Sequence, residues 1–399
     1  MISVEVALER VLDGCRPTAP EMVALPASLG RVLAEDVAAR VAHPPLDVSA
    51  MDGYAVRAAD LPQPGRLSVI GESAAGRPFA GTLGAGQAVR IFTGAGMPPG
   101  ADTVVMQEDA TRAGDTVDIT IAPTPGKHVR TRGLDFQPGQ IGLKAGTVMG
   151  PRQIALAAAM NVPWLTVRRR PRVAVLSTGD EIAMPGDPLG PAQLVSSNGP
   201  GIAALITLLG GEPVQLGIAR DTRESLSAMV AAASGCDLLV TSGGASVGDY
   251  DLVQDVLAEH GLKLDFWKIA MRPGKPLMFG TLRNVPVLGL PGNPVAAMVC
   301  SYVFLAPMLR AMQGLGGGLP TLTAVLDAPV TANDARQDYM RAGLRRDGHG
   351  IPVATPYGRQ DSAVVSGLAA AQALIVRPPH AEAARAGDTV TVIPLPDGF

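Results

Sequence analysis

The chain has 399 residues, of which 47% are hydrophobic and 17% charged, and its formal net charge is −3 at pH 7. Such a chain can bury sizeable cores, so disorder is excluded and about two to four domains are expected. The small negative charge and the aromatic content of 4% give no support for a nucleic-acid surface or a base-stacking platform.

The first 168 residues are expected to form a discontinuous helical domain that carries an insert. Leu8, Val11 and Leu12 share a helical face, Ser28–Val37 suggests a second short helix, and Pro151 fits the first turn of a helix at 151–160. Between them, prolines and glycines separate short β-prone runs. These runs are Arg66–Ile70, Ala88–Phe92, Thr103–Met106 and Thr116–Ile121. We therefore predict a helical domain from 1–40 and 140–168, and a β-rich insert at 41–139.

Strand-like and helix-like segments alternate from 169 to 316. The expected strands are Arg172–Leu176, Glu212–Gly217, Asp237–Thr241 and Val285–Leu290, and the expected helices are Gly199–Leu209, Arg223–Ala233, Asp251–His260 and Val295–Met312. Nearly continuous apolar strands are typical of a parallel sheet covered on both faces, so a three-layer α/β domain is predicted. After a flexible linker, Gly314–Pro320, residues 317–399 alternate short apolar and polar runs and are predicted to form a small β-domain.

The spacing of the cysteines and the character of the N-terminus indicate the cellular compartment in which the protein is expected. Cys15, Cys236 and Cys300 lie far apart and form no C-x-x-C motif, so neither a disulfide framework nor a thiolate metal site is expected. The N-terminus carries acidic residues early, unlike a signal peptide. No stretch approaches the roughly 18 apolar residues, free of charges and helix breakers, that a membrane span needs. We expect a soluble cytoplasmic protein.

Three loops at predicted strand ends are rich in glycine and polar residues, namely 177–181, 241–249 and 291–294. In open parallel sheets, ligands bind beyond the carboxyl ends of the strands. Gly243 and Gly244 allow close backbone approach, and their N–H groups can form a nest for phosphate in front of the next helix. We favour an anion site in this second loop over an ordinary turn, although it matches neither a Walker loop nor a dinucleotide-binding motif.

Charged residues gather at the same predicted edge. Asp180, Glu181, Asp221 and Asp251 lie at or near strand ends, where they could hold Mg²⁺ bridging phosphates; helix capping explains them equally well. The run 268–276 brings three cations together in a proline-containing loop: Lys268, Arg272 and Lys275. A surface turn is the alternative, but facing the glycine loops this run would complete a pocket for a phosphorylated or oxyanionic ligand.

Eight motifs follow one another along residues 44–300. They are MDGYAVR at 51–57, IFTGA at 91–95, RTRGLD at 130–135, STGDE at 177–181, SNG at 197–199, SGGASVGDYD at 242–251, KIAMRPGKP at 268–276 and LPGNPV at 290–295. In this order they resemble the molybdopterin molybdenumtransferases, the family that includes the E domain of gephyrin. Arg341 and the QDS run of 360–362 extend the resemblance toward the C-terminus.

The resemblance implies an architecture and a reaction. The chain would be multidomain, α/β plus β, with a discontinuous helical part, a β-rich insert, a molybdopterin-binding α/β domain and a C-terminal β-barrel. It would form a homodimer in which the insert of one subunit reaches the α/β domain of the other. The implied enzyme consumes adenylylated molybdopterin and molybdate, with Mg²⁺ assisting, and releases AMP and molybdenum cofactor. A molybdopterin adenylyltransferase and the proteins that mature molybdoenzymes are the implied partners.

Functional positions carry over residue by residue. The resemblance implies catalytic roles for Asp52, Glu181, Lys268 and Arg272, and a tentative Mg²⁺ site at Glu181, Asp221 and Asp251. It implies substrate contacts at Thr93, Asp135, Asp221, Asp251, Pro291, Pro294, Arg341 and Ser362. The loops themselves add Ser177, Thr178, Gly179, Asp180, Asn198, Ser242, Gly243, Gly244, Ser246, Gly248 and Lys275. Position 272 is Arg where some relatives have Lys, which keeps the charge and changes the donor geometry.

These roles combine into one hypothesis with three alternatives. Lys268 and Arg272 would hold molybdate near the dithiolene, carboxylates including Glu181 would place Mg²⁺ on the phosphates, and Asp52 would promote AMP release. The alternatives are a molybdopterin adenylyltransferase, a tungsten-specific insertase and a gephyrin-like scaffold. The extra domains and the MDGYAVR motif disfavour the first, and no motif separates tungstate from molybdate.

Overall fold

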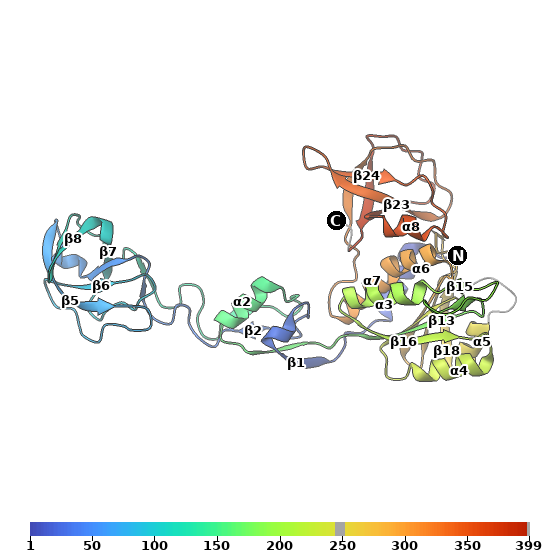
Figure 1. The fold of residues 1–399 in the computed structure, drawn as a ribbon, viewed down its shortest axis with the longest axis horizontal. Coiled ribbons are helices and arrows are strands. Elements are labelled where there is room, and N and C mark those ends of the chain that lie inside the picture. Colours follow the sequence, from blue (N-terminus) through green and yellow to red (C-terminus); the bar gives the residue numbers. More distant parts are fainter. Residues whose placement is uncertain (244–251, 397–399) are drawn as a thin grey trace. The chain divides into compact units, whose positions relative to one another are not determined.

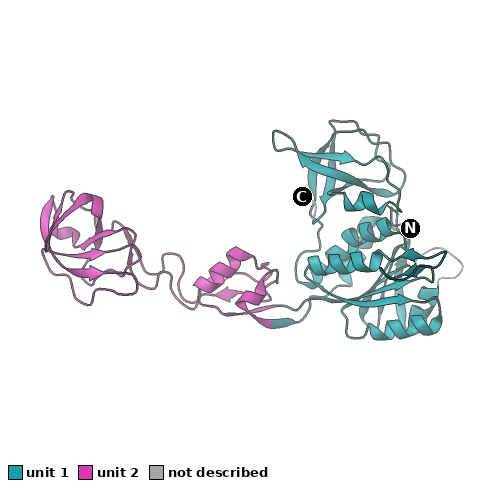
Figure 2. Cartoon of the chain, viewed as in Figure 1, with its two compact units in different colours: residues 1–21, 168–399 teal, residues 22–167 magenta. Residues whose placement is uncertain are grey.

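The computed structural model describes residues 1–243 and 252–396, and the chain forms two compact units (Figures 1 and 2). One unit comprises Met1–Glu21 with Arg168–Phe399, and the other comprises Met22–Val167. Two paired strands, β1 (Pro20–Ala24) and β12 (Trp164–Arg168), include the points at which the chain passes from one unit to the other. The units are described separately below.

The smaller unit, 22–167, contains a six-stranded sheet of order β7-β4-β6-β5-β9-β8. Its strands are β4 (Gly53–Val56), β5 (Gly65–Ser73), β6 (Gln87–Ile91), β7 (Thr103–Met106), β8 (Ala110–Ala113) and β9 (Thr116–Ile119). All four β-prone runs of the sequence therefore lie in strands. Apolar side chains on the two faces form separate cores, one around Tyr54 and Leu67 and the other around Val89 and Ile91.

The helix predicted at 28–37 is wrong. The structure has only a short 3₁₀ turn at Leu25–Ser28, and Val37–Ala38 is a strand, β2, that pairs with β11 (Ile141–Leu143). The N–H of Leu33 donates to the Thr147 carbonyl instead of to a carbonyl four residues earlier. Pairing with a distant segment has overridden the local helical pattern. The predicted helix at 151–160 is confirmed as α2 (Pro151–Ala159).

The larger unit is built on a six-stranded sheet of order β16-β13-β17-β21-β20-β18. The strands are β13 (Arg172–Thr178), β16 (Glu212–Ala219), β17 (Leu238–Ser242), β18 (Leu262–Trp267), β20 (Met278–Leu282) and β21 (Val285–Leu290). The first four in the order are parallel, whereas β20 is antiparallel to both of its neighbours. The four predicted strands are thus parallel as expected, and β18 and β20 extend the sheet beyond the prediction. The segment between β18 and β20 is too short for a crossover, so these strands form an antiparallel pair.

Helices cover both faces of this sheet (Figure 1). Along β13, Val173 and Val175 enter the core that contains α3 (Asn198–Leu208), whereas Ala174 and Leu176 enter the core that contains α4 (Arg223–Ala232) and α5 (Leu252–Glu259). Successive side chains of a strand point to opposite faces, so this alternation confirms the three-layer arrangement.

The N-terminal helix α1 (Val4–Asp13) packs in the first of these cores through Val4, Ala7 and Val11. It therefore belongs to the larger unit, not to the discontinuous helical domain predicted for 1–40. The amphipathic pattern was informative about the helix but not about the surface that buries it.

One helical segment, Pro294–Met312, is long and apolar enough to span a membrane, unlike the sequence expectation. It comprises α6 (Pro294–Cys300), a π-helical turn (Ser301–Leu305) and α7 (Ala306–Met312). In its most apolar window, 78% of the residues are buried inside the protein. A helix that is hydrophobic all round and covered by protein is a core helix, and Val303, Phe304 and Leu305 lie at the centre of the larger core.

The C-terminal residues of the larger unit form a closed five-stranded barrel. Its strands are β22 (Leu322–Leu326), β23 (Gln337–Arg346), β24 (Pro352–Pro356), β25 (Ala373–Arg377) and β26 (Thr389–Pro394). Pairing of β23 with β25 closes the ring. A short strand from the α/β domain, β19 (Met271–Arg272), pairs in parallel with Gln337–Asp338 of β23, so the cationic loop of the α/β domain is joined directly to the barrel.

Candidate functional site

One edge of the central sheet collects nearly all of the predicted site residues of the α/β domain. Because β20 is antiparallel to both β21 and β18, β18 runs in the same direction as the four parallel strands. Lys268, directly after β18, therefore lies at the same edge as Asp221 after β16 and Gly243 after β17. Adjacent strands lie about 4.8 Å apart, so the edge from β16 to β18 is about 24 Å long. We call this edge the rim.

Asn198 joins two strand-end loops at the centre of the rim. Its amide nitrogen donates to the Ser242 hydroxyl and to the Gly292 carbonyl, both at 2.8 Å. Asn198 is the first residue of α3, and Gly199 lies beside Ser177, which is buried at the end of β13. The structure thus brings together the predicted residues Ser177, Asn198 and Ser242.

Gly243 needs to be glycine. Its φ is +94°, and a Cβ atom there would lie 2.6 Å from the carbonyl oxygen of Thr178, which is itself buried. Gly179, also predicted, has a positive φ of 133°. Only glycine adopts such backbone conformations without strain, as a loop that approaches a ligand closely requires. Gly244, Ser246, Gly248 and Asp251, which the sequence also assigned to this site, lie outside the described residues.

Carboxylates occupy one end of the rim. The Asp221 N–H donates to the Asp180 carboxylate at 3.2 Å, and Glu181 follows directly. Burial raises the pKa of the Asp221 carboxyl, and the negative charges of Asp180 and Glu181 raise it further. Among the described residues, no group of three or more acidic, histidine or cysteine side chains is placed to hold a metal ion. Asp251, the third residue of the Mg²⁺ site predicted from the sequence, lies outside the described residues, so that site stays a prediction.

Lysine side chains occupy the other end. The Lys268 ammonium lies 4.0 Å from the centre of the Trp267 indole ring, a cation–π contact. The Lys268 φ of 71° is unusual for a residue other than glycine, and its N–H donates to the Leu277 carbonyl at 3.1 Å. The loop between β18 and β20 is therefore shaped, as predicted, and Lys275 on it is exposed.

Arg272 is held by the barrel. Its Nε and Nη2 donate to one oxygen of Asp338 at 3.0 and 2.6 Å, and Nη2 also donates to Asn333 at 3.1 Å. Asp334 accepts from Nη1 at 3.3 Å. The Asp338 carboxylate raises the pKa of Arg272 further above its usual range. Each side-chain nitrogen of Arg272 already has a partner in the barrel, so an oxyanion would share this arginine with those partners, and the predicted oxyanion role stays a prediction.

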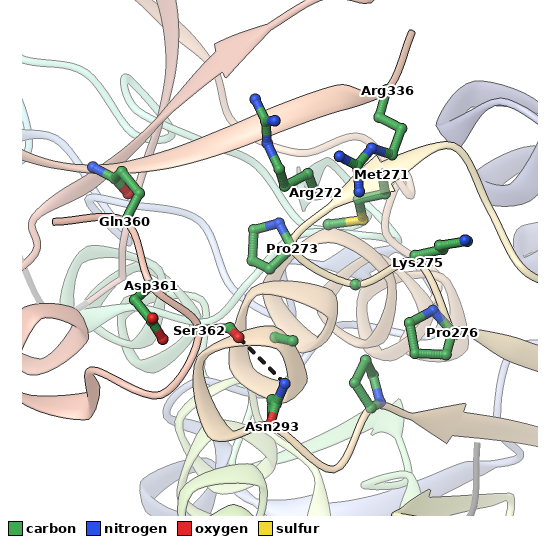
Figure 3. A pocket seen from close by; sticks show the side chains of 13 residues that line it. Met271, Arg272, Pro273, Lys275, Pro276, Asn293, Arg336, Gln360, Asp361 and Ser362 are labelled. Atoms are coloured by element: carbon green, nitrogen blue, oxygen red, sulfur yellow. Dashed lines mark hydrogen bonds between the residues drawn. The ribbon is translucent and has the colours of Figure 1, made fainter. Parts of the chain in front are cut away.

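A cavity of about 470 Å³ lies between the cationic loop and the barrel (Figure 3). It is lined by Met271, Arg272, Pro273, Gly274, Lys275, Pro276, Pro291, Asn293, Ala296, Arg336, Gln360, Asp361 and Ser362. Figure 3 shows Arg272 and Arg336 on one side and Asn293 and Ser362 on the other, where the Asn293 amide donates to the Ser362 hydroxyl at 3.2 Å. Pro294, the first residue of α6, shapes the turn next to Asn293. The predicted Arg272, Lys275, Pro291 and Ser362 therefore share one pocket.

Arg341 is placed behind this pocket and not in it. Its side chain is 1% exposed, and its guanidinium donates to the carbonyls of Arg359, Asp361 and Val364 at 2.9–3.1 Å. Gln360 accepts from its backbone N–H at 3.0 Å. The predicted ligand contact is thus corrected: Arg341 is a positioning residue that holds the loop carrying Ser362.

In the smaller unit, Asp52 and Thr93, which were predicted as separate site residues, are joined by hydrogen bonds. One Asp52 oxygen accepts from the Thr93 N–H at 2.7 Å and from its hydroxyl at 2.8 Å. These bonds hold the pKa of the Asp52 carboxyl below its ordinary value, so it is ionised at neutral pH. Asp135 is exposed, and its N–H donates to the His43 carbonyl at 3.0 Å; no side-chain contact to Asp52 is recorded for it among the described residues.

Comparison with known proteins decides the family. Three family profiles match: the MoeA N-terminal region (domain I and II) at 2–161, a probable molybdopterin binding domain at 174–311, and the MoeA C-terminal region (domain IV) at 323–395. A molybdopterin molybdenumtransferase of Nostoc sp. is 40% identical, covering 94% of this chain and 89% of its own, and one of Haemophilus influenzae is 36% identical over 99% of both. A molybdopterin biosynthesis MoeA structure from Pyrococcus horikosii superposes with a TM-score of 0.88 at 34% identity, over 100% of both chains.

The chain belongs to the molybdopterin molybdenumtransferase family. Within this molybdenumtransferase framework, the structure adds residues that sequence reasoning missed. Trp267 supports Lys268, and Asn333, Asp334 and Asp338 hold Arg272. The barrel residues gave no motif signal, because they meet the cationic loop only through the pairing of β19 with β23.

Replacing Thr93 by Val should raise the pKa of Asp52 in this molybdenumtransferase. The variant loses the hydroxyl donor and keeps the backbone donor, so the pKa should move toward the ordinary value without reaching it. A depressed carboxyl pKa stabilises the fold above the ordinary pKa, and this stability is lost as the pH falls through the folded-state pKa. Wild type and variant should therefore differ in stability at neutral pH and converge in acid.

A carbon-13 NMR titration of the Asp52 carboxyl measures this directly. Thr120→Val is the matched control, because the Thr120 hydroxyl donates only to the Asp109 backbone carbonyl. An unchanged or lower Asp52 pKa in Thr93→Val would show that the hydroxyl does not stabilise the carboxylate.

Proposed function

We propose that this chain inserts molybdenum from molybdate into adenylylated molybdopterin, forming molybdenum cofactor and releasing AMP, in the cytoplasm. The observation that carries the proposal is the order of groups along the rim: carboxylates at Asp180 to Asp221, the glycine turn at Gly243, then cations at Lys275 and Lys268. A rim of about 24 Å suits an extended substrate that has a nucleotide at one end and a pterin at the other.

Each group of residues along the rim complements a charge that is present in the reaction. The substrate pyrophosphate is anionic, and the glycine backbone lets N–H groups approach it closely. Molybdate is a dianion that must approach the two dithiolene sulfurs, and fixed cations stabilise charge that gathers there. We assign Lys268 and Lys275 to that task, together with Arg272, which lines the pocket. Holding pterin and molybdate side by side would supply much of the rate through effective molarity.

Mg²⁺ is part of the proposal as an ion shared with the substrate. Burial raises the pKa of Asp221, and the negative charges of Asp180 and Glu181 raise it further, so a cation near these carboxylates would favour their ionised forms. Mg²⁺ characteristically takes one or two carboxylates and completes its ligands with phosphates and water. Glu181 and Asp221 would hold the ion, which would neutralise the phosphates at which AMP leaves.

We further propose a homodimer in which Asp52 of one subunit acts at the rim of the other. Asp52 is ionised and anchored by Thr93, so it can orient water or Mg²⁺ but cannot donate a proton at neutral pH. A role in AMP release across the interface follows from this charge and from the motifs around it.

The direct test supplies purified protein with adenylylated molybdopterin, Mg²⁺ and molybdate. AMP release and cofactor formation should both require molybdate, and pyrophosphate should not appear when molybdopterin and ATP are supplied instead. Lack of molybdate-dependent AMP release would overturn the proposed activity, and pyrophosphate release would favour an adenylyltransferase.

A mixing experiment tests the shared site. Asp52→Ala and Lys268→Ala proteins are each expected to be nearly inactive, and dissociation and reassociation of the two should restore about a quarter of wild-type activity. Half of the randomly formed dimers would be mixed, and each mixed dimer would have one site with both residues intact. If Asp52 serves its own subunit, every site lacks one residue and the mixture stays inactive.

A further inference from the structure

The pocket beside the barrel separates its cations from their counter-ions. Arg272, Lys275 and Arg336 line the cavity, whereas Asp334 and Asp338 do not. The carboxylates nevertheless touch the arginines, since Asp338 accepts from Arg272 at 2.6 Å and Asp334 accepts from Arg336 at 2.8 Å. The arginines thus stand between the cavity and the carboxylates, an arrangement suited to an anion that enters from the cavity side.

The Arg336 side chain bonds to fewer residues than the Arg272 side chain does. Its Nη2 and Nε donate to the two oxygens of Asp334, at 2.8 and 3.4 Å, and its backbone N–H donates to the same carboxylate at 2.8 Å. The Arg336 side chain is 32% exposed. Arg272, by contrast, is shared among Asp338, Asn333 and Asp334. Arg336 therefore keeps a fixed orientation with donor capacity left for a ligand.

The base of this arrangement is rigid. The Asn333 amide nitrogen donates to the carbonyls of Arg336, Arg377 and Pro378 at 2.7–3.0 Å, and its oxygen accepts from the Asp334 N–H at 2.9 Å. Asp334 is thereby fixed between the two arginines, and hydrogen bonds from Arg336 lower the pKa of its carboxyl to about 2. It remains a full negative charge at any pH at which the enzyme works.

We propose that Arg336 is an additional oxyanion-binding residue of this pocket, and that Asp334 is the positioning residue that orients its guanidinium. The inference rests on the proposed function in taking molybdate as the anion. A tetrahedral dianion in the cavity would meet Arg336 and Lys275 as well as the hydroxyl of Ser362 on the opposite wall.

The first experiment compares Arg336→Met with Arg345→Met. Arg345 is an arginine of the same barrel that is paired with a carboxylate, Asp327 at 3.7 Å, and it does not line the cavity. Loss of one charge-assisted contact should raise the KM for molybdate about 10-fold or more in Arg336→Met, with kcat for AMP release within about twofold. Arg345→Met should leave both constants unchanged.

Arg336→Lys keeps the charge and loses the two-point attachment to Asp334. An intermediate rise in KM, about threefold, is expected because the ammonium is not held in one orientation. Thermal unfolding of each variant shows whether the barrel is intact, so the lysine variant still tests the inference if the methionine variant unfolds.

Asp334→Asn separates positioning from simple charge. Removing a negative charge beside the pocket would by itself strengthen anion binding and lower the KM for molybdate. If Asp334 orients Arg336, its loss should instead raise the KM, by about threefold to 10-fold. A lower KM in Asp334→Asn would overturn the positioning role, and an unchanged KM in Arg336→Met would overturn the binding role.

Calorimetric titration with molybdate alone keeps the inference independent of the reaction. Wild type should bind molybdate more tightly than Arg336→Met does, and with the same affinity as Arg345→Met. If wild type releases no AMP but binds molybdate more tightly than Arg336→Met, the proposed function fails and the anion site stands. If wild type releases AMP but binds molybdate no more tightly than Arg336→Met, the proposed function stands and Arg336 is not an anion-binding residue.

Discussion

Lys268→Ala should lower the rate of AMP release by about 100-fold or more, the usual effect of removing one preorganised group that stabilises developing charge. The Lys268 ammonium contacts the Trp267 ring at 4.0 Å, and the backbone that carries this side chain has an unusual φ of 71°. A cation held so firmly at the rim needs no reorganisation when molybdate and the dithiolene meet. Single-turnover measurement with adenylylated molybdopterin separates this chemical step from substrate binding.

Lys263→Ala is the matched control for that experiment. Lys263 is an exposed lysine of β18, the strand that Lys268 directly follows, and it lies five residues before Lys268 and away from the rim. The control should retain wild-type rates, because removal of one exposed charge changes little. Equal rates in wild type and Lys268→Ala would remove Lys268 from the catalytic group, and equal losses in both variants would indicate a general effect of charge.

The sequence predicted the fold best where structure is local or strongly periodic. The buried parallel strands are nearly continuous apolar runs, and β13, β17 and β21 lie within about two residues of the predicted ranges. Strand β18 was not predicted, because half of the residues of Leu262–Trp267 are exposed and two of them are charged. The helix predicted at 28–37 does not form for a related reason, because the backbone of this segment pairs with residues 146–149 of the same unit.

The candidate site, like the fold, could be predicted best where its signals are local in the sequence. Glycine loops at strand ends are a local signal, so Ser177, Ser242 and Gly243 could be assigned to one rim before any coordinates. Asn198 was assigned with them, but its role in joining two loops depends on amide geometry. The burial of Arg341 and the barrel partners of Arg272 could not be predicted, because burial and partner choice are properties of the folded chain that charge and spacing do not reveal.

Arg341→Ala should cause the largest loss of stability of any variant considered. The arginine is 1% exposed, and its guanidinium bonds to three backbone carbonyls of the loop 359–364. Its removal leaves a cavity and three unpaired acceptors, each of which costs about 1–3 kcal/mol when buried. Allowing for relaxation and entry of water, we expect a loss of about 3–5 kcal/mol in the free energy of unfolding.

Differential scanning calorimetry should show this loss as a fall of roughly 6–20 °C in the unfolding temperature of the larger unit, given about 2–4 °C per kcal/mol for a body of this size. Arg345→Ala is the control, because that arginine is exposed and paired at 3.7 Å, and its loss should cost under about 1 kcal/mol. The unfolding temperature of Arg341→Lys should lie between those of Arg341→Ala and Arg345→Ala, because one ammonium cannot reach all three carbonyls that the guanidinium of Arg341 bonds. If Arg341→Ala unfolds at the wild-type temperature, the loop that carries Ser362 does not depend on the buried guanidinium. A fall in stability joined to a higher molybdate KM is the result expected if Arg341 acts on the pocket only by holding that loop in place.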